Sequence, residues 1–265
     1  MSELKPQGLK KSQILLYGFF GMFLNTFYLM FLAYNRLFYL TNVLQLSTQI
    51  SAVVNTLSVW GNVVTMLLAG AIIEKFTFKS GKFRTWTIIG GIVVGIAFTL
   101  LFANFGLSQG VAGALFVVMF VIQSIGYNTL WVAERSLVGP MSTTAADANS
   151  LAMVAQQGST LGGLIYGVVN PFIMKAVGDN YTWTALVYGL FIVLGTLGMF
   201  SLTRNFDSGS EPVVAAQKKE QVKGGFLKAM TGPTLPFFFA MILNNMHLGF
   251  FMTLLAYFTQ YVLQD

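Results

Sequence analysis

Seven long apolar stretches constrain the fold of this chain more than any other feature. A helix crosses a bilayer with about 20 mostly apolar residues. None of the stretches shows the strict alternation that a transmembrane barrel needs. The sequence therefore predicts an all-α integral membrane protein. The predicted spans run approximately over Ile14–Leu40, Gln49–Ile73, Trp86–Phe105, Val111–Glu134, Ser150–Val177, Trp183–Leu202 and Leu235–Leu263.

Composition agrees with a membrane protein and narrows its chemistry. Only 9% of the 265 residues are charged and 55% are hydrophobic, whereas a soluble domain carries about 25% charged residues. The chain has no Cys and one His, His247, so we expect no metal site, no cofactor and no thiol chemistry. The net charge is +6, but the basic residues lie in short loops. They indicate topology and not a nucleic-acid partner.

Lysine and arginine residues predict the orientation. Thirteen of them lie in the N-terminal tail, the loop near residues 74–84, the end of the fourth span and residues 204–228; only Arg36 and Lys175 lie on the other side. The positive-inside rule then places the N-terminus in the cytoplasm of a multi-pass cell-membrane protein. The first apolar run lacks a small-residue cleavage site and is longer than the core of a signal peptide, so we interpret it as a retained helix.

The organisation along the chain suggests two unequal parts. Residues 1–203 are predicted to form a six-helix transmembrane bundle, made of two three-helix repeats. Residues 204–233 are charged and rich in small residues, as in a cytoplasmic linker. Residues 234–265 are predicted to be a seventh helix, which resembles the first one and places Asn244 where the first has Asn25. If that repetition is real, the seventh helix begins a second half, as in transporters of the major facilitator superfamily.

Polar side chains follow one face of several spans, and these are the candidates for binding a solute. Amides and hydroxyls both donate and accept hydrogen bonds, as sugar hydroxyls do, and an aromatic ring can stack on a sugar. The alternative for each single residue is a hydrogen bond that joins neighbouring helices. We expect a shared cavity near mid-membrane. The predicted solute-binding residues are Asn25, Tyr28, Asn62, Thr65, Asn128, Trp131 and Gln156.

Glycine pairs at four-residue spacing predict close helix contacts. The pairs are Gly91 with Gly95, Gly158 with Gly162, and Gly163 with Gly167.

The loop from Gly70 to Trp86 carries the most specific motif. Its sequence GKFRTW, Gly81–Trp86, resembles the signature of the glycoside–pentoside–hexuronide cation symporter family, which includes melibiose permease and has Gly-Lys-Phe-Arg/Lys-Pro-Trp there. Further similarities are Gly70 before the motif, Tyr17-Gly18, residues 38–47 and residues 136–138. The resemblance covers nearly the whole chain. It implies a secondary transporter of a small polar solute, a sugar or a glycoside-like compound, that works by alternating access.

The chain departs from this family at the positions that would carry charge inside the membrane. Asn25 stands for an Asp in the first span, Asn62 and Met66 stand for two cation-binding acids, Trp131 stands for an acidic sugar ligand and Gln156 stands for an Arg. Because all these partners are absent together, no buried charge is left without its counterpart. The pattern argues against family-type sodium or proton coupling, and the sequence does not identify a coupling ion.

Two groups of charges remain near helix ends. We interpret Glu134 and Arg135 as an interfacial ion pair at the cytoplasmic end of the fourth span, with a role in proton coupling as the alternative. The resemblance implies that Glu74, Lys75, Lys82 and Arg84, in the loop after the second span, form part of a gate, while the simpler explanation is that they only set topology.

Other classes of protein fit less well. A retinal protein needs a Lys in its last helix, and Leu235–Leu263 has none. An enzyme needs a nucleophile, base or metal cluster, which the spans do not supply. A transporter-like sensor or scaffold, or a carrier of a different substrate such as a lysolipid, remains as the alternative.

Overall fold

The computed structural model describes residues 9–76, 78–207 and 236. The first helix is continuous over Lys11–Val43 and contains two π-helical turns. Its parts are α1 (Lys11–Gly18), η1 (Phe19–Phe23), α2 (Leu24–Phe38) and η2 (Tyr39–Val43). The helices that follow are α3 (Thr48–Lys75), α4 (Lys82–Leu101), α5 (Gln109–Ser136), the short α6 (Val138–Met141), α7 (Ala145–Ala176) and α8 (Tyr181–Leu202).

The first six predicted spans each coincide with an observed helix, and the ends differ by at most five residues. Five of these helices are long and apolar enough to cross a membrane: Lys11–Val43, Thr48–Lys75, Lys82–Leu101, Gln109–Met141 and Tyr181–Leu202. The sixth, α7, is long enough but carries more polar residues, among them Gln156 and Asn170. The structure is thus an all-helical membrane domain. The seventh predicted helix, the linker after residue 207 and the repetition they imply lie outside the described residues.

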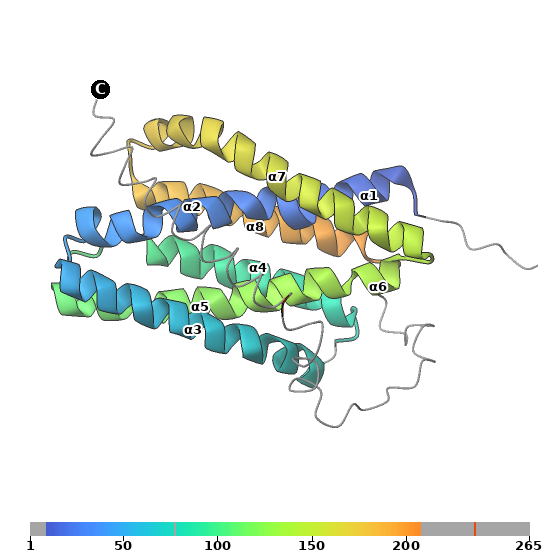
Figure 1. Cartoon of the computed structure of the whole chain (residues 1–265), viewed down its shortest axis with the longest axis horizontal. Coiled ribbons are helices and arrows are strands. Elements are labelled where there is room, and N and C mark those ends of the chain that lie inside the picture. The colour runs from blue at the N-terminus through green and yellow to red at the C-terminus, as the bar shows by residue number, and fades with distance from the viewer. Residues whose placement is uncertain (1–8, 77, 208–235, 237–265) are drawn as a thin grey trace, which may run out of the picture.

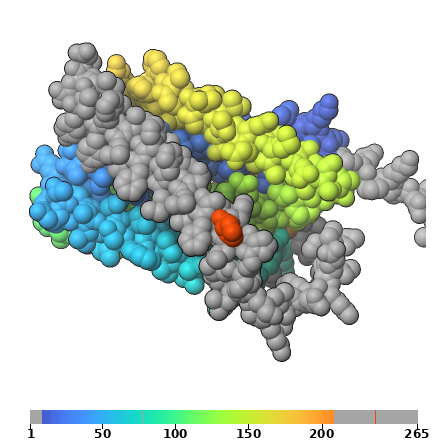
Figure 2. Space-filling view, viewed as in Figure 1, coloured from blue at the N-terminus to red at the C-terminus, as the bar shows by residue number. Residues whose placement is uncertain are grey.

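The helices lie side by side along the long axis of the molecule (Figure 1). Helix α3 packs on α5, α5 on α4 and α4 on α8, while α8 packs on α2 and the first helix packs on α7. As a result, α3 and α7 form opposite edges of the face shown in Figure 2. The seven predicted solute-binding residues all lie on α2, α3, α5 and α7, and none lies on α4 or α8.

Glycines set the closest helix contacts, as two of the three spaced pairs predict. A Cβ atom at Gly158 of α7 would lie 2.5 Å from the main-chain oxygen of Gly18, and one at Gly162 would lie 2.8 Å from that of Phe23. Gly95 of α4 similarly faces the backbone of α8. The prediction that Gly163 and Gly167 form a close helix contact was wrong, because a Cβ atom at Gly167 would meet no atom within 4 Å in the described part of the chain.

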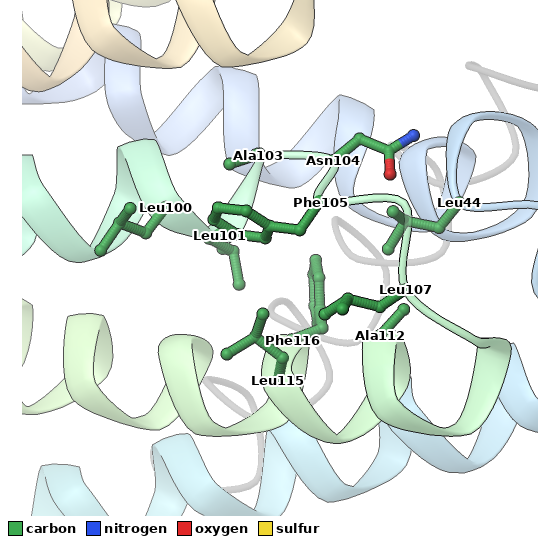
Figure 3. A pocket seen from close by; sticks show the side chains of 10 residues that line it. All are labelled: Leu44, Leu100, Leu101, Ala103, Asn104, Phe105, Leu107, Ala112, Leu115 and Phe116. Atoms are coloured by element: carbon green, nitrogen blue, oxygen red, sulfur yellow. The ribbon is translucent and has the colours of Figure 1, made fainter.

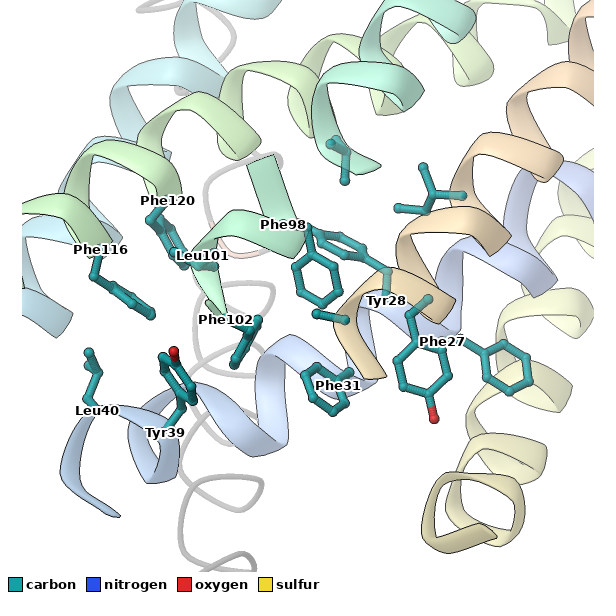
Figure 4. Close-up of a cluster of buried hydrophobic side chains, with 14 of the residues drawn as sticks. Phe27, Tyr28, Phe31, Tyr39, Leu40, Phe98, Leu101, Phe102, Phe116 and Phe120 are labelled. Atoms are coloured by element: carbon teal, nitrogen blue, oxygen red, sulfur yellow. The ribbon is translucent and has the colours of Figure 1, made fainter. Parts of the chain in front are cut away.

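A cluster of aromatic side chains fills the core between the first helix, α4 and α5 (Figure 4). Phe31 contacts Phe98 and Phe102 edge to face, with ring centroids 5.9 and 4.9 Å apart. Tyr39 joins the same cluster through Phe102 at 5.0 Å. These rings are fully buried and close the end of the bundle where the first helix finishes. Such ring contacts stabilise the fold beyond the effect of the area they bury. They therefore fix the relative positions of the first helix, α4 and α5, which carry polar groups farther along.

Candidate functional site

A group of amides and a hydroxyl joins α3 to α5. The Nδ2 atom of Asn128 donates to the Oδ1 atom of Asn62 at 3.0 Å and to the Oγ1 atom of Thr65 at 2.9 Å. Asn62 and Thr65 share a face because they lie three residues apart on a helix. Three of the predicted residues are therefore brought together. These hydrogen bonds link the two helices, and Asn62, which is only half-buried, remains within reach of a solute.

Trp131 lies one helical turn beyond Asn128 on the same face of α5. Its side chain is 36% exposed. The guanidinium of Arg135, another turn along, lies 4.3 Å from the ring centroid, in a cation–π contact. Trp131 thus offers an accessible aromatic surface next to the amides of Asn62 and Asn128.

Asn25 and Tyr28 lie deeper, at 3% and 1% exposed. Asn25 donates to both carboxylate oxygens of Glu134 at 3.2 Å, and the Tyr28 hydroxyl donates to Gln123. Both bonds connect the first helix to α5. These two predicted residues therefore lie in a separate polar network in the interior, and a solute would meet them only after these contacts open.

Gln156 is exposed on α7, at the far edge of the bundle from α3. Its main-chain oxygen accepts from Thr160 at 3.0 Å, and no side-chain bond joins it to another candidate in the described part of the chain. The seven residues thus fall into three groups: the α3–α5 group with Trp131, the interior pair, and Gln156 alone.

The interpretation of Glu134 and Arg135 as an interfacial ion pair was wrong. Glu134 is 3% exposed and takes its hydrogen bonds from Asn25, while Arg135 lies over Trp131. Adjacent residues on a helix do not face each other, so neighbours in sequence are directed to different surroundings. The carboxylate packs beside Gly21 of the first helix: a Cβ atom at that glycine would be in ordinary contact, 3.9 Å, with the Glu134 carboxyl carbon.

The four predicted gate residues differ in their surroundings. Glu74 and Lys75 are exposed at the end of α3, and Lys82 is half-buried at the start of α4. Arg84 is buried, with only 7% of its surface exposed, and its guanidinium lies 3.8 Å from the centre of the Phe200 ring of α8. Arg84 is therefore engaged within the bundle, whereas Lys75 and Lys82 each lie over the ring of the next residue in sequence, Phe76 and Phe83, at 5.7 and 5.5 Å.

Asp207 was missed by the sequence-based prediction, which assigned it to the linker. Its carboxylate accepts from the main-chain nitrogens of Lys82, Phe83 and Arg84 at 3.2, 2.7 and 2.8 Å. It thereby satisfies the free N–H groups at the start of α4, where Gly81 has no side chain to do so. The only sequence signal was an acid shortly after an apolar helix, which is common and does not name a partner.

The two cavities described at the other end of the bundle do not include the candidate residues. One, of about 10 Å³, lies among Leu44, Leu101, Phe105, Leu107 and Phe116 (Figure 3); this is about the space of a single water. The other is an apolar groove of about 360 Å³ between α3 and α5, lined by residues that include Ile50, Leu57 and Val117. Neither has the polar lining that a sugar needs.

The fold and the polar groups between its helices define a polytopic membrane protein with the features of a carrier. A family model described as "MFS/sugar transport protein" matches residues 12–265. The chain belongs to this family, the melibiose-permease-like sugar symporters that the Gly81–Trp86 motif resembles. These proteins are transporters and not enzymes.

Curated relatives agree with this membership. The chain is 30% identical over 155 residues to a raffinose carrier protein of Pediococcus pentosaceus, a match that covers 52% of this chain and 24% of the relative. It is 27% identical over 135 residues to a lactose permease of Lactobacillus delbrueckii subsp. bulgaricus, covering 46% and 22%. It is 24% identical over 191 residues to YnaJ, an uncharacterized symporter of Bacillus subtilis, covering 71% and 41%. The matches span less than half the length of these relatives.

Proposed function

We propose that this protein carries a sugar or a glycoside-like polar solute across the cell membrane, with its N-terminus in the cytoplasm. In the complete protein the six-helix bundle would rock against a second bundle around a central solute site. Glu74, Lys75 and Lys82 would hold one gate closed through contacts with that second bundle. The names of two relatives, a raffinose carrier and a lactose permease, support this solute class.

The observation that carries the proposal is the exposed Trp131 ring beside the amides of Asn62 and Asn128. Hydrogen bonds between α3 and α5 would by themselves suit simple helix packing. An aromatic ring left 36% exposed one turn from those amides is better explained by a bound solute. Sugars are recognised by this combination, in which a ring stacks on the apolar face and amides bond the hydroxyls.

Replacing Trp131 with alanine should weaken solute binding by more than about 1 kcal/mol, close to fivefold in Kd. Raffinose and lactose serve as the two probe sugars, and binding to the full-length protein is measured by calorimetry. Trp183→Ala is the matched control, because Trp183 is also exposed, at 57%, but lies on α8. Equal losses in both variants, or none in Trp131→Ala, would contradict the proposed site.

Binding of the probe sugars should not require sodium. Sodium favours hard oxygen ligands, and a carboxylate adds the full charge that strengthens cation binding in a low-dielectric site. Asn62 offers a neutral carbonyl, Thr65 a hydroxyl, and Met66 only a thioether on a side chain that is 58% exposed. Affinities in sodium and in choline chloride should agree within about twofold. A sodium requirement that disappears when Asn62 or Thr65 is changed would show that these residues do hold the ion.

The apolar groove between α3 and α5 favours one alternative, a lysolipid carrier, because an acyl chain would find about 360 Å³ of apolar space there. Flux measurements in vesicles separate the possibilities. Uptake of a probe sugar supports the sugar carrier, uptake of labelled lysolipid supports the alternative, and binding without flux indicates a sensor or scaffold.

A further inference from the structure

Glu134 is a carboxylate enclosed by the helix bundle. Its side chain is 3% exposed, and both oxygens accept from the same amide nitrogen of Asn25 at 3.2 Å. The hydroxyl of Tyr17 donates to the main-chain oxygen of Glu134 at 3.0 Å, and no residue in the described ranges other than Asn25 donates to the carboxylate itself. One shared amide is a small compensation for a charge removed from water.

No positive charge pairs directly with this carboxylate among the described residues. The titratable groups around it are Tyr17 of α1 and, on its own helix, Tyr127 and Arg135. The other elements at this point contribute uncharged groups: Gly21 of η1, Asn25 of α2 and Met199 of α8.

The guanidinium of Arg135 is the one cation near Glu134 in the described part of the chain, and it is turned elsewhere. It lies over Trp131, one of its terminal nitrogens is 3.8 Å from the sulfur of Met22, and its buried Nε atom has no partner among the described residues. A thioether is a weak acceptor, so the cation–π contact with Trp131 is the main interaction that holds the guanidinium in this part of the chain.

The amide of Asn25 supplies a second observation. Its Oδ1 atom is buried and has no hydrogen-bond donor in the described structure, although the residue is 3% exposed. A protonated Glu134 carries an O–H group that can donate to such an oxygen after a small rotation, while the amide nitrogen continues to donate to the other carboxyl oxygen. Protonation therefore removes the buried charge and satisfies the unpaired acceptor in one step.

We propose that Glu134 is a proton-binding site of this protein and that Arg135 is the counter-charge of its ionised form. The proton comes from water, is held on the Glu134 carboxyl against Asn25, and returns to water when the guanidinium balances the carboxylate. This site is distinct from the positions at which the resembled family carries its acids, since those are occupied here by Asn25, Asn62, Met66 and Trp131.

The site connects to solute binding through Arg135, and this step alone rests on the proposed function. A sugar that stacks on Trp131 displaces the guanidinium that now lies on that ring, and thereby changes how well Arg135 balances the Glu134 carboxylate. If displacement weakens that balance, bound sugar favours proton uptake. By reciprocity, the protonated form then binds sugar more tightly than the ionised form.

Infrared spectroscopy of the full-length protein in lipid vesicles tests the proton site without any substrate. Exposed Asp and Glu side chains are ionised at about pH 7 and give no carbonyl band of a protonated carboxylic acid. If Glu134 is protonated, such a band should be present at this pH and should disappear at alkaline pH. Glu134→Gln should remove this band. The control Asp179→Asn should retain it, because Asp179 is exposed at a loop position with φ of 55° that Asn adopts readily.

Arg135→Gln tests the counter-charge. Without the cation the ionised form is less stable, so the midpoint of the band should move to higher pH by more than about one unit. An unchanged midpoint overturns the role of Arg135. The absence of a protonated-carboxyl band in the wild-type protein at neutral pH, or its persistence in Glu134→Gln, overturns the proton site whatever the protein transports.

Sugar binding across the same pH range separates this proposal from the proposed function. In the wild-type protein the affinity for a probe sugar should fall about tenfold above the midpoint, and in Glu134→Gln it should not change with pH. If the band titrates but neither probe sugar binds at any pH, the proton site stands and the proposed solute class fails. If sugars bind equally well on both sides of the midpoint, the linkage is refuted.

Discussion

Replacing Asp207 with alanine is expected to lower the free energy of unfolding by about 3 kcal/mol. Its carboxylate, 8% exposed, accepts from three successive main-chain N–H groups at the start of α4. Removing it leaves these donors unpaired at a largely buried position and removes a negative charge from the positive end of the helix dipole. The same contact fastens the chain after α8 to α4, so its loss should loosen both helix ends together.

Two further variants make this prediction specific. Asp207→Asn keeps the size and one acceptor oxygen but not the charge, and it should lose about half as much stability. Glu74→Ala removes an exposed acid from the end of α3 and should change stability by no more than about 0.5 kcal/mol. Denaturant unfolding of the protein in detergent measures all three. A loss in Asp207→Ala no larger than in Glu74→Ala would show that the cap does not matter.

The positions of the membrane helices could be predicted because bilayer thickness imposes a length and a composition on each of them. Most of the observed ends differ little from the predicted ones, and the larger shifts have local causes. At α4 the helix begins at Lys82 and not at Trp86, because Asp207 caps it earlier. At α7 it begins at Ala145, where Thr144 and Asp147 form a capping box.

Much less of the candidate site could be predicted, because its contacts join residues far apart in the chain. The step of three between Asn62 and Thr65 was readable as one helix face, whereas their bond to Asn128 depends on how α3 meets α5. Asn25 and Glu134 are 109 residues apart, and nothing in either segment names the other. Sequence separates polar residues from apolar ones within a span, but the packing of the helices decides which of them become partners.

The contact between α1 and α7 depends on glycine, and Gly158→Ala should lower the free energy of unfolding by about 2 kcal/mol. The added Cβ atom would lie 2.5 Å from the main-chain oxygen of Gly18, a distance that real Cβ atoms do not adopt. Since that oxygen belongs to the backbone of a helix, it cannot move aside alone. The two helices must separate, and the neighbouring contact of Gly162 with Phe23 then loosens as well.

Gly167→Ala on the same helix is the matched control, and we expect the opposite sign. A Cβ atom at Gly167 would meet nothing within 4 Å in the described structure, so the substitution only improves helix propensity and should stabilise the protein by about 0.5–1 kcal/mol. The two variants add the same methyl group to the same helix, but at Gly158 it is buried against α1 and at Gly167 it is exposed, so a difference between them reports the packing at Gly158. Thermal unfolding in detergent should place the wild-type protein between them. Equal stability of the two variants would mean that α7 does not pack on α1 through Gly158.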